Sequence, residues 1–71
     1  MELLIKKEKY HKGIDSEFYT LKARYNNINF NITYDSKTEN IIIHEWYKFD
    51  NIQITDINEK IKLHFKSKTE K

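Results

Sequence analysis

The sequence predicts an α+β fold: an antiparallel meander of about four strands with one C-terminal helix packed on one face. Apolar and polar residues alternate without interruption over 27–34, which is typical of a strand with one buried face. Near the C-terminus, apolar residues recur at helical spacing instead. With 71 residues, the chain has room for one small domain, 1–71.

The first two strands are expected on either side of the only glycine, Gly13. Residues 2–10 can form one strand, and residues 17–25, rich in aromatic side chains, can form the next. Asn26 and Asn27 tolerate positive φ at low cost, so they predict a tight hairpin turn into a third strand over 28–34.

A polar hexapeptide, 35–40, predicts a second hairpin loop, in which Asn40 can take a left-handed conformation. A fourth strand is expected over 41–47, beginning with three consecutive isoleucines. Such a run indicates a strand with both faces partly covered, and therefore a central one.

The C-terminal third fits two structures. Ile54, Ile57, Ile61 and Phe65 fall on one helical stripe that leaves Leu63 outside, whereas 60–66 alternate as a strand would. The alternative to the helix is therefore an all-β fold with a C-terminal hairpin.

Charge placement favours the helix. Asp56 and Glu59 resemble a capping box, and the lysines that follow them complement a helix dipole. We expect a helix over 56–67, with the tail frayed from about residue 66.

Composition restricts the setting of the protein. The chain has no cysteine, which excludes a disulfide framework and fits a reducing cytoplasm. Neither a signal peptide nor an apolar stretch of the ~20 residues that a membrane span needs is visible, so a soluble, cytoplasmic protein without membrane contacts is expected. The net charge of +2 combines basic ends with an acidic middle, which suits a mixed-charge partner better than a uniform polyanion.

Motifs for catalysis are missing from the sequence. His11, His44 and His64 do not have metal-ligand spacing, and one glycine cannot build a phosphate-binding loop. We therefore expect no enzyme activity, no metal and no cofactor.

Two groups of residues are candidates for partner binding. The first is Trp46, Tyr47 and Lys48, because Trp and Tyr are enriched at binding hot spots. Alternation along a strand would point Trp46 and Tyr47 to opposite faces, and a tryptophan here also suits a core anchor between helix and sheet. The second group is Phe18, Lys22 and Arg24, on the sheet face opposite the helix, where aromatic and basic side chains resemble a nucleic-acid-binding surface.

The sequence thus predicts a small, non-catalytic module that acts through protein contacts. Ile, Lys and Asn, which have AT-rich codons, make up 30 of the 71 residues, as would suit an accessory protein of a phage or mobile element that inhibits or redirects a host complex. The alternative is a nucleic-acid-binding domain that uses the basic sheet face and the lysine-rich ends. A homodimer whose interface completes the core is a third hypothesis.

Overall fold

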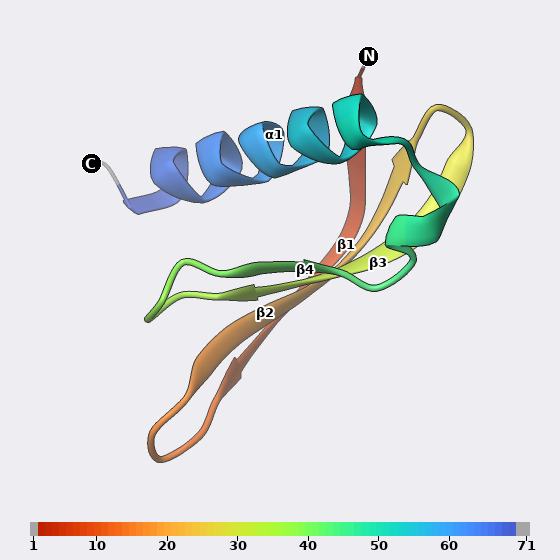
Figure 1. The fold of residues 1–71 in the computed structure, drawn as a ribbon. Helices are drawn as coiled ribbons and strands as arrows, with labels where there is room; N and C mark the ends of the chain where they lie inside the picture. The colour runs from red at the N-terminus through yellow and green to blue at the C-terminus, as the bar shows by residue number, and fades with distance from the viewer. Residues whose placement is uncertain (1, 70–71) are drawn as a thin grey trace.

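A single antiparallel sheet with a helix across one face forms the fold (Figure 1). The computed structural model describes residues 2–69. Its elements are β1 (Leu3–Lys12), β2 (Glu17–Tyr25), β3 (Ile28–Asp35), β4 (Ile41–Ile43), a short 3₁₀ helix η1 (Trp46–Lys48) and α1 (Asn51–Thr69). The strands lie in the order β1-β2-β3-β4, which confirms the predicted α+β meander.

The hairpin turns follow local backbone preferences. In the β1–β2 turn, Gly13 N donates to Ser16 O at 2.8 Å. Asn26 and Asn27 have φ of 52° and 62°, as predicted for the β2–β3 turn. In the β3–β4 loop the left-handed residue is Glu39, with φ of 62°, and not Asn40 as predicted.

The position of that left-handed residue has a simple cause. Asn40 O already accepts from Asp35 N at 2.9 Å, so Asn40 lies at the closing end of the hairpin loop. The chain must therefore reverse one residue earlier, at Glu39, whose N donates to Asp35 O.

The fourth strand is shorter than predicted and lies at an edge, not in the centre, of the sheet. Only residues 41–43 pair with β3, and His44 N makes one further bond to Asn31 O before the chain leaves the sheet. Ile43 is buried while Ile42 is about half exposed. In so isoleucine-rich a chain, three in a row do not require two covered faces.

The helix begins at Asn51, five residues before the predicted start. Its capping box is formed by Asp50 and Gln53: Asp50 Oδ1 accepts from Gln53 N at 2.8 Å, and Gln53 Oε1 accepts from Asp50 N at 3.1 Å. Asp56, predicted to begin the helix, lies inside it and accepts a hydrogen bond from the Tyr25 hydroxyl at 2.6 Å. Residues 66–69, expected to fray, are helical, and residues 70–71 lie outside the described chain.

The core lies between α1 and the sheet. Ile57 and Ile61 are fully buried, and the Phe65 ring stacks on Tyr34 with centroids 3.9 Å apart. Leu63 is 63% exposed, so the helical stripe is confirmed and the all-β alternative is wrong. The buried set is Leu21, Ala23, Tyr25, Phe30, Ile32, Tyr34, Ile43, Phe49, Ile57, Ile61 and Phe65.

Strand β1 is also tied to α1 by charged groups. His64 Nε2 lies 2.7 Å from Glu8 Oε1, and Lys68 pairs with the same carboxylate. Burial lowers the pKa of His64. Because Lys68 already balances the charge of Glu8, the carboxylate does little to offset that burial.

In residues 2–69, no helix is both long enough and apolar enough to cross a membrane.

Candidate interaction surfaces

Trp46 and Tyr47 lie together on η1, and both are exposed. Their side chains are 65% and 68% accessible, and the rings contact edge to face with centroids 6.1 Å apart. The predictions that they point to opposite faces and that Trp46 anchors the core are wrong. Both assumed a strand through residue 47, but the strand ends at Ile43, and successive residues of a 3₁₀ helix are about 120° apart rather than 180°.

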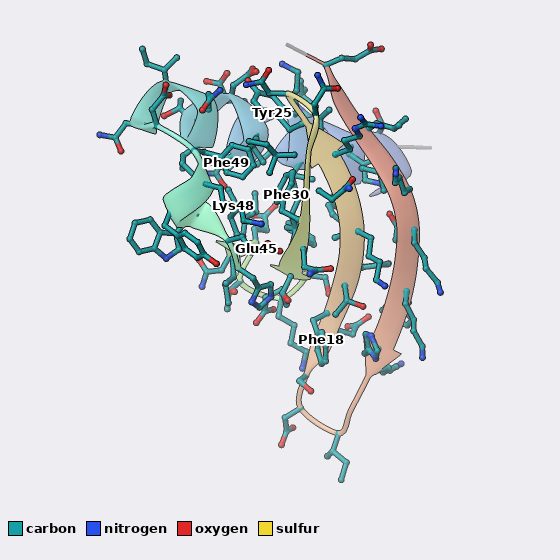
Figure 2. The ribbon with its side chains drawn as sticks, turned by 90° about the vertical axis from the view of Figure 1, so that its right-hand side faces the viewer. Phe18, Tyr25, Phe30, Glu45, Lys48 and Phe49 are labelled. Carbon is teal, nitrogen blue, oxygen red and sulfur yellow. The ribbon has the colours of Figure 1, made fainter. Side chains whose placement is uncertain are left out.

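The turn that carries these rings is braced on both sides. Before it, Glu45 accepts from Lys48 Nζ at 2.7 Å and from Asn31 Nδ2 at 3.4 Å. After it, Phe49 is buried, with its ring 4.9 Å from that of Phe30 (Figure 2). The Lys48 ammonium lowers the pKa of Glu45. The ion pair between them lies within the turn and stabilises it, so the charge of Lys48 is already balanced there.

The second candidate group lies on the face of the sheet that α1 does not cover, here called the outer face. Leu21, Ala23 and Tyr25 are buried against the helix, so the alternate residues of β2 point the other way. These are Phe18, Thr20, Lys22 and Arg24. Figure 2 shows Phe18 near the β1–β2 hairpin, well away from Glu45 and Lys48. The structure therefore separates Phe18 from the η1 turn, whereas Lys22 lines one hollow together with Glu45, the residue just before that turn.

A β-bulge in β1 adds lysines to the outer face. Ile5 pairs with Ala23, but the next partner of β2, Lys22, pairs with Lys7, so Lys6 is an extra residue. Lys6 and Lys7 line two adjacent hollows of the outer face, and Lys22 lines both. Lys6 and Lys7 were predicted only as part of the lysine-rich ends, not as members of this face. The visible signal was a break in alternation after Leu3 and Ile5.

Basic side chains outnumber acidic ones on the outer face. Its cations are Lys6, Lys7, Lys9, Lys22 and Arg24. Glu45 lines one hollow with Lys6 and Lys22 and pairs with Lys48, and Asp35 accepts from the amides of its own loop. Glu2 lies beside Arg24 at one end. Between the cations are Asn29, Asn31, Thr20 and Thr33, which carry amide and hydroxyl groups.

Two of the three histidines also lie on this face. The His11 ring stacks on Phe18, with centroids 4.7 Å apart and planes at 14°, and its Nε2 is 3.0 Å from Thr20 Oγ1. His44 Nε2 lies 2.7 Å from Thr33 Oγ1. Within residues 2–69, no three His, Asp or Glu side chains gather as a metal site would require.

A cleft of about 600 Å³ lies between α1 and the loop end of the sheet. Tyr34 and Phe65 line it, but their rings stack on each other and are almost fully buried. Lysines 62, 66 and 68 and Glu39 form its rim. The cleft is thus an open end of the core, and Tyr34 and Phe65 expose little surface in it.

Comparison of this chain with protein-family models, with curated proteins and with solved structures gave no match. Function is therefore inferred from the two exposed surfaces, the Trp46–Tyr47 pair and the outer face.

Proposed function

We propose that this protein is a small, non-catalytic binding module that acts through protein contacts centred on Trp46 and Tyr47. The supporting observation is that both rings are about two-thirds exposed on one short turn. Covering such rings would remove on the order of 100 Å² of apolar surface from water for each, a gross gain of roughly 2.5 kcal/mol per ring before the costs of association.

The bracing of η1 supports this proposal energetically. Because Phe49 is held in the core and Glu45 is bonded to Lys48 and Asn31, the turn is ordered before any partner binds. A preorganised turn avoids much of the entropy cost of ordering a loop on binding, so more of the gross gain appears as affinity.

The proposed setting is the cytoplasm, where an accessory protein of a phage or mobile element inhibits or redirects a host complex. The cysteine-free, Ile-, Lys- and Asn-rich composition supports this setting. The proposed partner is a different protein rather than a second copy, because β1, the long edge strand, carries Lys6, Lys7, Lys9 and Lys12, which disfavour edge-to-edge pairing.

Affinity capture with matched variants tests the proposal. The native protein, Trp46→Ala and Ile14→Ala are used as baits in nuclease-treated extract of the cells that express the protein. Ile14 is 99% exposed at the β1–β2 turn, so its variant controls for loss of exposed apolar area elsewhere. We expect a protein retained by the native and Ile14→Ala baits and lost with Trp46→Ala.

Capture of the same proteins by Trp46→Ala and the native bait would contradict the proposal. Light scattering over a concentration range examines the homodimer hypothesis. A molar mass that doubles in the native protein and not in Trp46→Ala would assign the aromatic pair to self-association instead.

A further inference from the structure

We propose that the outer face binds single-stranded nucleic acid, at a surface distinct from the Trp46–Tyr47 pair. This inference goes beyond the proposed protein contacts and does not depend on them. It rests on the bulge at Lys6, on the pairing of Lys7 with Lys22, and on the ring stack at one end of the same face.

The bulge concentrates charge on one side of β1. Ile5 packs against the core, and Glu8 pairs with His64 on the helix side. Between these two inward residues an unbroken strand would place one outward side chain, but the bulge supplies Lys6 and Lys7. Both lysines are thereby added to the face that already carries Lys22.

The pairing of Lys7 with Lys22 works against stability. The two residues are direct partners across β1 and β2, where like charges are destabilising. Among residues 2–69, none of the five outer-face cations makes an ion pair with a carboxylate. Glu45 lines a hollow with Lys6 and Lys22, and Glu2 lies beside Arg24, but neither carboxylate forms an ion pair with these cations. A bound polyanion would therefore relieve the repulsion among them.

The neighbouring groups favour nucleic acid over an acidic protein. Phe18 and His11 form a stacked pair on the same face, and aromatic rings beside basic side chains are how sheet surfaces hold single strands. Asn31 and Thr33 add hydrogen-bonding groups between the cations and β4. An acidic peptide would use the cations alone, with no role for the stacked rings.

The number of cations on the outer face sets the expected salt dependence of nucleic-acid binding. If all five cations contact phosphates, log K falls with log[salt] at a slope of about −3.5, since each contact on a single strand contributes roughly −0.7. Affinity should then fall about 100-fold between roughly 50 and 200 mM salt.

The test compares two charge reversals with the same change in net charge. Lys7→Glu acts on the outer face, and Lys37→Glu acts in the exposed β3–β4 loop. Binding of a labelled oligothymidine to the full chain is followed by fluorescence anisotropy at low and moderate salt, with melting temperature as a second measurement. We expect Lys7→Glu to weaken binding at least tenfold at low salt and to flatten the salt slope, while Lys37→Glu changes affinity less than threefold, since it removes no phosphate contact.

The melting temperature separates loss of binding from loss of folding. Lys7→Glu replaces a like-charge pair with an opposite-charge pair, so its melting temperature should equal or exceed that of the native protein. A third variant, Phe18→Leu, keeps an apolar side chain and removes the ring, and should weaken binding about tenfold.

Several results would overturn the inference: no binding at low salt, equal weakening by Lys7→Glu and Lys37→Glu, or equal affinity for polyglutamate. Tighter binding to a duplex of the same length would reject the single strand as the ligand. Trp46→Ala should bind oligothymidine like the native protein, so failure here and failure of the proposed protein contacts are distinguishable.

Discussion

Truncation of Ile61 and of Leu63 to alanine should have very different effects on stability. Both changes remove three carbons, but Ile61 is fully buried beneath α1 and Leu63 is 63% exposed. At about 0.8 kcal/mol per buried carbon, Ile61→Ala loses ~2.4 kcal/mol of transfer free energy, and the residual cavity adds more, within a range of about 2–5 kcal/mol. Leu63→Ala should cost under about 1 kcal/mol, partly offset by the higher helix propensity of alanine.

The difference, about 2 kcal/mol or more, is large for a domain of this size. A chain of 71 residues is expected to unfold with roughly 4–11 kcal/mol. Urea titration followed by far-UV circular dichroism measures both variants, because the exposed Trp46 is a poor fluorescence probe of unfolding. If Ile61→Ala does not fold, Ile61→Val gives a smaller loss of about 0.5–1.5 kcal/mol on the same scale. Equal losses for Ile61→Ala and Leu63→Ala would refute the helical stripe, since a strand would bury both.

Two further predictions concern the ends of α1. Burial lowers the pKa of His64 below its unfolded value of about 6.5, so the unfolded chain binds the extra proton and stability should fall as pH drops from about 7 to 5.5. His64→Gln should flatten this dependence in denaturant titrations at several pH values; an unchanged slope would mean that groups other than His64 cause the pH dependence. At the other end, Asp50→Ala should cost about 1 kcal/mol by removing the capping box with Gln53. Thermal melts check this value, and no loss would show that the cap is not stabilising.

The fold was predictable where the apolar pattern of a segment and the backbone angles that its turns need pointed to the same structure. Residues 28–34 alternate without error, and Asn26 and Asn27 both adopt positive φ. The start of α1 was misplaced because only Asp56 with Glu59 was considered as a capping box, although Asp50 with Gln53 has the same spacing. Only the structure shows that the Asp56 carboxylate binds the Tyr25 hydroxyl across the core.

The residues of the two candidate surfaces could be predicted from their types, but where the fold places them was harder to predict. Lys22 and Arg24 lie on the expected face because β2 is regular. The orientation of Trp46 depended on where β4 ends, and a strand end at an edge has no strong local signal when isoleucine is abundant. The bulge at Lys6 was not predicted for a related reason: the break in alternation after Ile5 does not by itself distinguish a bulge from the end of a strand, and neither a glycine nor any other special residue marks it.

The lysines of β1 can also be explained without a nucleic-acid ligand. Edge strands often carry lysine to prevent pairing with other chains, and β1 is an edge strand. That explanation accounts for Lys7 and Lys9 but not for Lys22 and Arg24, because β2 is paired on both sides and has no edge to protect. Nor does it require Lys7 to face Lys22, since an acidic residue in β2 would protect the edge equally and add a favourable cross-strand pair. A ligand that neutralises both strands together accounts for the cations of β1 and β2 at once.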